Sequence, residues 1–225
     1  MEINFEEFSN ELKKEIKTYS FLNKIPLTNL AWEERVYNAL SYSGIDEKHI
    51  LWTPGSHKSG KDIDVYDKYF FSCKSMVTEN GVARLSSFRT TSFNTIEEKI
   101  NFIDNKGKNF THYLIVARTD TKDALKYKAY MIDADYIQAS KYEWNETFGK
   151  IKRNLGKFTG WETPYVDGIK LKIARNMSDQ LWIHMDTNNF HCESGIKTLT
   201  EVSVEHKYIG QLWKNYRDGV LNVRD

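Results

Sequence analysis

Between Gly60 and Ser75, apolar and polar side chains alternate in two short runs that are separated by Asp67 and Lys68. Alternation with a period of two is typical of β-strands, so this pattern predicts two strands joined by a turn. One face of the predicted hairpin is mostly apolar and carries Ile63, Val65, Tyr69, Phe71 and Cys73. The polar residues gathered on the opposite face are Asp62, Asp64, Ser72 and Lys74.

The length of the connection decides whether Asp62 and Lys74 project from the same face of this hairpin. A two-residue turn would pair Tyr66 with Tyr69 and would place Asp62 and Lys74 on opposite faces, because a one-residue slip reverses every side chain. A three-residue connection pairs Val65 with Tyr69 and puts both on one face. We therefore predict a three-residue connection, formed by a type I turn with a bulge.

Two amphipathic helices are predicted before the hairpin. The first covers residues 3–18. The second runs from Asn29 to Ser43, with Thr28 or Asn29 as its N-cap and Gly44 as its stop signal. A short apolar strand follows at residues 49–52.

Glu33 lies on the predicted inward face of the second helix, together with Val36 and Leu40 at spacings of three and seven residues. A glutamate on such a face must be paired or bound to a metal ion, because burying an unpaired charge is costly. The alternative is that Glu33 sits at the edge of the helix and is solvated.

After the hairpin, residues 76–94 are predicted to form a long polar loop, and residues 95–104 a helix that a capping box opens. Residues 111–118 are rich in β-branched and aromatic side chains and predict an interior strand. A strand, a helix and a strand at this spacing imply a right-handed parallel crossover from the Lys74 strand. The remaining expectations are strands at 126–132, 169–173 and 181–185, helix at 133–155 and 208–216, and loop at 156–167.

The composition is that of an ordinary soluble globular protein, with 225 residues of which 40% are hydrophobic and 28% charged. No apolar run reaches the length of a membrane span, and the acidic N-terminus lacks a signal-peptide core. With two cysteines, Cys73 and Cys192, a disulfide framework is excluded, so we expect a cytoplasmic protein. A net charge of +1 argues against a strongly basic non-specific nucleic-acid binder. The same net charge is compatible with a local basic groove set against an acidic metal site.

Other common sites are not indicated. His184, His191 and Cys192 match no zinc spacing and lack a fourth ligand, and neither a P-loop nor a nucleophile elbow is present.

An aspartate beside a lysine on one face of a sheet can support phosphodiester cleavage. A carboxylate can hold Mg²⁺, which prefers oxygen ligands, and the metal ion polarises the phosphoryl group and lowers the pKa of a bound water. A lysine near the scissile phosphate offsets developing negative charge. The basic loop at residues 53–60 could approach a nucleic-acid backbone. The alternatives are a hairpin with a solvated charged face and a plain connecting loop.

The order helix, three strands, helix and strand across residues 29–118 resembles the core of the PD-(D/E)xK nuclease superfamily, and the size resembles a type II restriction endonuclease. The motifs that carry this resemblance are Gly60-Lys61-Asp62-Ile63 leading to Ser72-Cys73-Lys74, preceded by Trp32-Glu33-x-x-Val36-x-x-x-Leu40-x-x-x-Gly44. It implies an α/β fold with a restriction-endonuclease-like core, α-β-β-β-α-β, in which helices flank a mixed central sheet. We expect one nuclease domain over residues 1–225, comprising an N-terminal helix (1–28), a catalytic core (29–118) and an extension for recognition and assembly (119–225).

The resemblance also implies roles for individual residues. Asp62 would bind the metal ion, the main-chain carbonyl of Cys73 would be a second ligand, and Lys74 would be the catalytic lysine. Ser72 stands where the family usually has a carboxylate, so another acidic residue is needed. Glu33 is our first choice; the substitutes, with Asp64 as a further contributor, are Glu34, Glu97 and Glu98.

The function that the resemblance implies is a Mg²⁺-dependent, sequence-specific endonuclease that cleaves double-stranded DNA to leave 5′-phosphates and acts as a homodimer. Candidate DNA-binding residues are Lys61, Arg84, Arg89, Asn176, Ser178 and Gln180. For each of them an ordinary surface role is the alternative. Two other functions stay open: a repair or junction-resolving nuclease of the same superfamily, and a non-catalytic DNA-binding module, which Ser72 makes credible.

Overall fold

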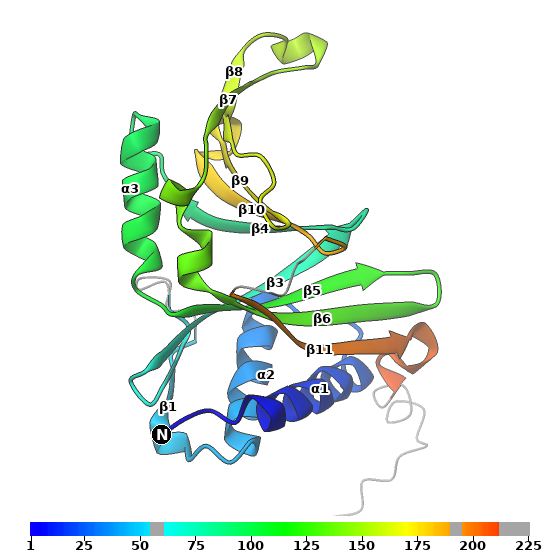
Figure 1. Ribbon diagram of the computed structural model, residues 1–225. Helices are drawn as coiled ribbons and strands as arrows, with labels where there is room; N and C mark the ends of the chain where they lie inside the picture. Colours follow the sequence, from blue (N-terminus) through cyan, green and yellow to red (C-terminus); the bar gives the residue numbers. More distant parts are fainter. Residues whose placement is uncertain (55–60, 190–194, 212–225) are drawn as a thin grey trace, which may run out of the picture.

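The computed structural model describes residues 1–54, 61–189 and 195–211, which form a mixed α/β fold (Figure 1). The helices are α1 (Phe5–Leu22), α2 (Asn29–Tyr42) and α3 (Ile96–Gly107). The strands are β1 (Ile50–Trp52), β2 (Ile63–Val65), β3 (Tyr69–Glu79), β4 (Val82–Arg89), β5 (His112–Asp120), β6 (Ala124–Asp133), β7 (Asn145–Phe148), β8 (Phe158–Glu162), β9 (Ile169–Ala174), β10 (Gln180–Asp186) and β11 (Ile196–Glu205).

These strands form an eleven-stranded sheet with the order β11-β6-β5-β3-β4-β10-β9-β8-β7, which β2 and then β1 join at β3. The sheet is mixed, because β3 and β5 are parallel whereas β5 and β6 are antiparallel. The parallel pairing of β3 with β5 confirms that the connection predicted across residues 74–118 is a parallel crossover; its right-handedness stays a prediction.

The sheet divides into two halves at the hairpin between β3 and β4. These strands pair at Thr78–Ala83 and Glu79–Val82, next to the turn, and then separate (Figure 1). Helices α1 and α2 cover one face of the half that contains β3, β5, β6 and β11. The second half, from β4 to β7, turns away from it, with α3 alongside.

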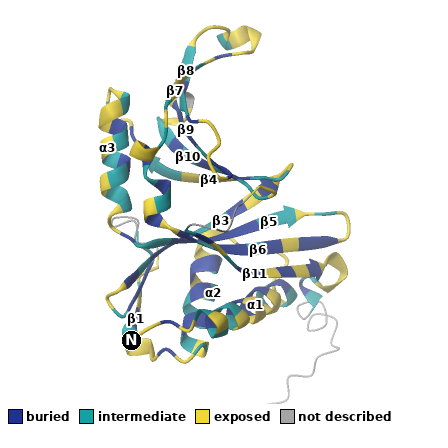
Figure 2. Ribbon diagram, viewed as in Figure 1, coloured by how far each residue is buried: buried dark blue, intermediate teal, exposed yellow. Residues whose placement is uncertain are grey.

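Two hydrophobic cores result, and β3 and β5 contribute alternate residues to both. Cys73 and Leu114 belong to the core under α1 and α2, whereas Met76 and Ile115 belong to the core between the two halves and α3. Figure 2 shows the central strands buried along most of their length. Because its faces alternate, β3 directs Ser72 and Lys74 to the side opposite α2.

The predicted hairpin is present, and its register is confirmed. Val65 pairs with Tyr69, and Ile63 with Phe71, so the connection contains three residues. The predicted type I turn is wrong. The two central residues, Tyr66 and Asp67, have φ values of 58° and 50°. Positive φ at both positions marks a type I′ turn, whose twist matches that of the flanking strands.

The predicted loop over residues 76–94 is wrong, because β3 continues to Glu79 and β4 occupies Val82–Arg89. The turn between them is Asn80-Gly81, a dipeptide that favours hairpin turns, with φ values of 51° and 78°. Strand β4 reads as polar because exposed Arg84 alternates with buried Ala83 and Leu85. The polar residues on the solvent-exposed face of β4 therefore explain why this strand was not predicted.

The prediction of helix at 133–155 is also wrong. This segment contains strand β7 and short 3-10 turns at Ala134–Ile137, Ala139–Lys141 and Lys152–Asn154. The predicted loop at 156–167 contains β8, and β11 was not predicted. Of the predicted helix at 208–216, residues 212–216 lie outside the described residues, and Tyr208 ends the 3-10 turn His206–Tyr208.

Both predicted N-terminal helices are present, and Thr28 is the N-cap of α2, since its side chain accepts from the Ala31 N–H. The strands predicted at 126–132, 169–173 and 181–185 correspond to β6, β9 and β10. Among the helices that the structure describes, none is long and apolar enough to cross a membrane.

Thr95→Ala is expected to lower the free energy of unfolding by about 1 kcal/mol, because it removes the N-cap of α3. The Thr95 side chain accepts from the Glu98 N–H, and Glu98 Oε2 accepts in return from the Thr95 N–H at 3.2 Å. Urea unfolding followed by circular dichroism measures the change. Glu97→Ala, at an exposed position of the same helical turn, is the control and should be nearly neutral. Equal losses for both variants would contradict the capping role.

Candidate active site

The candidate site lies beside the start of β2 at Ile63, where β3 continues with β5 on one side and, among the described residues, no strand partner on the other. The N–H and C=O groups of one strand residue point to the same side of the strand. At Cys73 this side faces the position that β2 would occupy if it extended beyond Ile63. Both backbone groups of Cys73 therefore need other partners.

Asp62 and Lys74 supply these partners. Asp62 Oδ2 accepts from the Cys73 N–H at 2.7 Å, and Lys74 Nζ donates to the Cys73 carbonyl oxygen at 3.0 Å. Lys74 Nζ also donates to Asp62 Oδ2 at 3.1 Å, which makes an ion pair between the two side chains. The Asp62 side chain is 10% exposed and the Lys74 side chain is 24% exposed, so solvent screens this ion pair only in part. The structure thus brings Asp62 and Lys74 together, as the three-residue connection requires.

Ser72 is the third polar side chain of this group. It is 2% exposed, and its hydroxyl lies 3.5 Å from Asp62 Oδ2. A hydroxyl at this position adds no negative charge, so Asp62 is the acidic residue of the group that faces Lys74.

Glu33 is buried on α2 at 7% exposure, so the solvated alternative is wrong. Its Oε2 accepts from Trp52 Nε1 at 3.4 Å. Helix α2, which carries Glu33, packs against the Cys73 side of β3, whereas strand alternation directs Lys74 to the opposite side. For Glu33 to act with Asp62, its carboxylate must reach past the open edge of β3.

The pKa of the Cys73 thiol reflects these neighbours. Burial raises this pKa well above its ordinary value, Asp62 and, to a smaller extent, Glu33 raise it further, and Lys74 opposes them. Asp62, Lys74 and Glu33 are therefore all close enough to act electrostatically on one buried sulfur atom. A fully buried thiol with a raised pKa is inert as a nucleophile.

The oxygen atoms of this site suit a small hard cation. The Lys74 ammonium already lies between Asp62 Oδ2 and the Cys73 carbonyl oxygen, the two atoms that the sequence predicts as metal ligands. Among the described residues, no group of three or more His, Cys, Asp or Glu side chains could hold a metal ion. Mg²⁺ does not need such a group, because it often binds through one or two carboxylates together with waters and substrate phosphates.

The other candidate carboxylates have partners elsewhere. Glu34 pairs with Arg35 at 2.6 Å and is half exposed, and Asp64 pairs with Lys61 at 2.8 Å. Glu98 Oε2 accepts two backbone N–H groups at the start of α3, and these bonds hold the pKa of its carboxyl below the usual value. Glu97 is exposed on the same helix.

The structure places three of the six candidate DNA-binding residues in strands, namely Arg84, Arg89 and Gln180. Arg84, half exposed on β4, lies 3.5 Å from Glu79. Arg89 is exposed at the end of β4 and is the register partner of Gln180, whose Nε2 donates to the Ser87 carbonyl.

The other three candidates are Ser178, Lys61 and Asn176. Ser178 is exposed in the turn before β10, with φ of 59°. Lys61 Nζ lies 4.4 Å from the centre of the Phe70 ring, in addition to its pair with Asp64. The Asn176 side chain lies outside the described residues.

Asn29 is a contributor that the sequence indicated only as a possible N-cap. Its Oδ1 accepts from the Ser75 N–H at 2.6 Å and from the Ser75 hydroxyl at 2.9 Å. This attaches the first residue of α2 to β3 directly after Lys74. An asparagine at a helix start has a local role as its commonest meaning, so no sequence signal pointed to a contact 46 residues away.

A solved structure described as a restriction endonuclease in complex with substrate DNA aligns with 81% of this chain and 85% of its own, at 11% identity. The TM-score is 0.36, which is too low to establish a common fold. No family model matches the chain, and no curated protein does. The assignment of a function therefore depends on the residues described above.

Proposed function

We propose that this chain is a Mg²⁺-dependent endonuclease of the type II restriction class, which hydrolyses phosphodiester bonds of double-stranded DNA and leaves 5′-phosphates. The observation that carries the proposal is the ion pair between Asp62 and Lys74, whose side chains also bond the two backbone groups of Cys73 that have no strand partner. A carboxylate and an ammonium group at a strand edge, beside a main-chain carbonyl oxygen that only a side chain bonds, match the needs of phosphodiester hydrolysis.

Each residue has a distinct role in this proposal. Asp62 and the Cys73 carbonyl would hold the metal ion, with Glu33 as the second carboxylate. When bound, Mg²⁺ polarises the phosphoryl group and lowers the pKa of a coordinated water. Lys74 would leave its two oxygen partners and place its charge beside the scissile phosphate, where it offsets the negative charge that develops in the transition state.

We expect the protein to act as a homodimer on palindromic sequences, because a two-fold dimer presents two equivalent sites to two equivalent half-sites. Sedimentation equilibrium would measure this oligomeric state.

Purified protein is expected to cut supercoiled plasmid into discrete fragments in the presence of MgCl₂ and to leave it intact in EDTA. Run-off sequencing of the fragments maps the cut, and ligation without prior kinase treatment reports the 5′-phosphate. Cutting confined to branched or damaged DNA would favour a repair or junction-resolving nuclease. Equal cutting in EDTA would contradict the metal requirement.

A non-catalytic DNA-binding module is the second candidate, and Ser72 favours it. This buried serine occupies the position next to Asp62 where a second carboxylate would complete a metal site. If Glu33 does not fill that role, affinity for Mg²⁺ would be low. Retention of duplex DNA on a filter without Mg²⁺-dependent cleavage would support the module and contradict the nuclease.

A further inference from the structure

Strands β7 and β8 and the segment between them form an arm that extends from the second half of the sheet (Figure 1, top). Backbone hydrogen bonds give its tip, residues 149–157, a defined shape. The Gly149 N–H donates to the Lys157 carbonyl at 2.8 Å, and the Gly156 N–H donates to the Gly149 carbonyl at 3.0 Å. A Cβ atom at Gly149 would lie 1.9 Å from the Asn154 carbonyl oxygen, so the tip is packed closely.

The tip is basic and has no acidic residue. Its four cations, all exposed, are Lys150, Lys152, Arg153 and Lys157. None of them forms an ion pair with another residue in the described part of the chain. Unneutralised cations at this density attract a polyanion.

Large apolar side chains are exposed among these cations. Ile151 is 62% exposed and Leu155 is 69% exposed, and Phe148 at the end of β7 is 49% exposed. Exposed apolar side chains gathered at the tip of an arm mark an interaction surface, because burying them there contributes nothing to the core.

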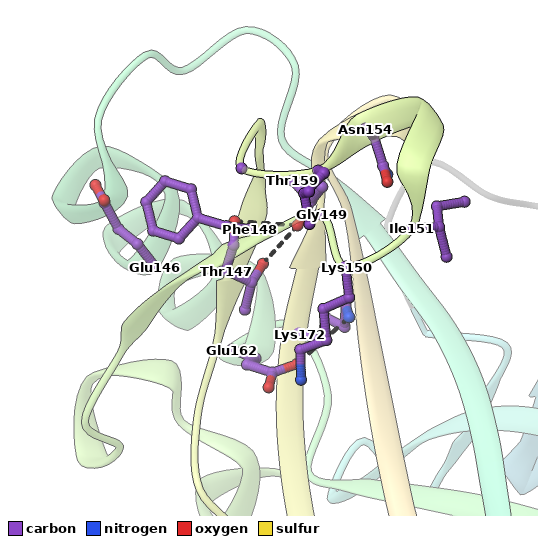
Figure 3. Close-up of a pocket in the computed structure, with 12 residues that line it drawn as sticks. Glu146, Thr147, Phe148, Gly149, Lys150, Ile151, Asn154, Thr159, Glu162 and Lys172 are labelled. Carbon is purple, nitrogen blue, oxygen red and sulfur yellow. Dashed lines mark hydrogen bonds and ion pairs between the residues drawn. The ribbon is translucent and has the colours of Figure 1, made fainter.

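A cavity of about 950 Å³ lies between the tip and the sheet, with Lys172 and Glu162 on one of its walls (Figure 3). In Figure 3, Lys150 from the tip and Lys172 from β9 point to the same part of this cavity. Glu162 Oε2 lies 3.2 Å from Lys170 Nζ and 3.4 Å from Lys172 Nζ, so one carboxylate forms ion pairs with two lysines.

The positive surface continues on the same face of β9, β10 and β4. His184 is the register partner of Lys170 on one side and of Arg84 on the other. Partial burial and the charges of Arg84, Lys170 and Lys172 lower the pKa of His184 to about 4. Glu146 and Glu162 are the acidic residues that line the cavity, and the cations of the arm and of this face outnumber them.

The charges decide between two occupants for the arm. A second copy of this chain would bring two sets of four like charges together, which costs free energy. Duplex DNA supplies phosphates for the cations, and its minor groove accepts apolar side chains that basic residues flank. We propose that the arm binds duplex DNA along the minor groove, with its four cations on phosphates and with Ile151 and Leu155 against the groove. This proposal deepens the endonuclease function and rests on it for the substrate class.

Fluorescence anisotropy of a labelled 30-base-pair duplex, with EDTA present to prevent cleavage, tests the proposal. The double variant Lys152→Ala/Arg153→Ala is expected to lose about ten-fold in affinity at physiological salt, and the slope of log affinity against log salt should fall by about 2. The matched control is Lys13→Ala/Lys17→Ala, which removes two exposed cations from α1 and should leave both quantities unchanged. Unchanged affinity and slope in the arm variant would overturn the proposal.

A second variant tests the apolar contact separately. Ile151→Ser/Leu155→Ser keeps every charge and should weaken binding several-fold without changing the salt slope. If this variant instead converted a dimer into a monomer with DNA affinity per protomer unchanged, the arm would be an assembly element and the proposal would be wrong.

Binding and cleavage separate this inference from the endonuclease proposal. A wild-type protein that binds through the arm but does not cut with Mg²⁺ contradicts the endonuclease alone. One that cuts normally while the arm variants bind like the wild type contradicts the arm alone. A wild-type protein that does not bind the duplex contradicts the arm proposal.

Discussion

Asp62→Asn is expected to reduce Mg²⁺-dependent cleavage of plasmid DNA by at least about 100-fold, without unfolding the protein. The Asp62 carboxylate holds both the Cys73 N–H and the Lys74 ammonium through one oxygen atom. Asparagine retains an oxygen that can accept from the Cys73 N–H, but it lacks the charge that attracts Lys74 or a metal ion. The initial rate of loss of supercoiled plasmid gives the size of the effect.

Asp67→Asn is the matched control for this variant. Asp67 is exposed in the turn of the same hairpin with φ of 50°, a conformation that asparagine adopts readily. It should cut at the wild-type rate. Lys74→Ala should be as inactive as Asp62→Asn, and full cutting by either of these two variants would end the assignment of this site.

Trp32→Ala is expected to lower the free energy of unfolding by about 3–5 kcal/mol, because a large side chain leaves a cavity in the core. Trp32 is fully buried, and its Nε1 donates to the Leu114 carbonyl of β5 at 2.9 Å. The variant therefore loses apolar contacts and leaves a buried carbonyl without this donor. Since domains are typically stable by about 5–15 kcal/mol, the loss should be large in urea unfolding followed by circular dichroism.

Leu30→Ala on the same helix is the control for this prediction. Leu30 is 56% exposed, so its truncation should change stability by no more than about 0.5 kcal/mol. A similar loss in both variants would mean that the effect does not come from the burial of Trp32, and the role of Trp32 as a core contact between α2 and β5 would be wrong.

The comparison of Lys74 with Glu33 shows where sequence reasoning about the site succeeded and where it stopped. Asp62 and Lys74 were predicted to meet, because alternation and the length of one short connection decide which side chains share a face of a hairpin. The inward position of Glu33 was also indicated by helical spacing. Its location on the Cys73 side of β3 depends on which face of the sheet α2 covers, and no local pattern contains that information.

The chain's own pattern determined the local elements: α1 and α2, the capping box of α3, the register of the β2–β3 hairpin and the apolar strands β5, β9 and β10. These follow from interactions between residues close in sequence. Tertiary structure alone decided the rest. Strand β4 has many polar residues along its exposed face and is identified by its pairing with β10. The β7–β8 arm has large apolar side chains exposed, so its sequence does not show which residues face a core. The open edge at Cys73 exists because β2 begins only at Ile63, opposite Phe71, and only the assembled sheet shows which backbone groups then lack a strand partner.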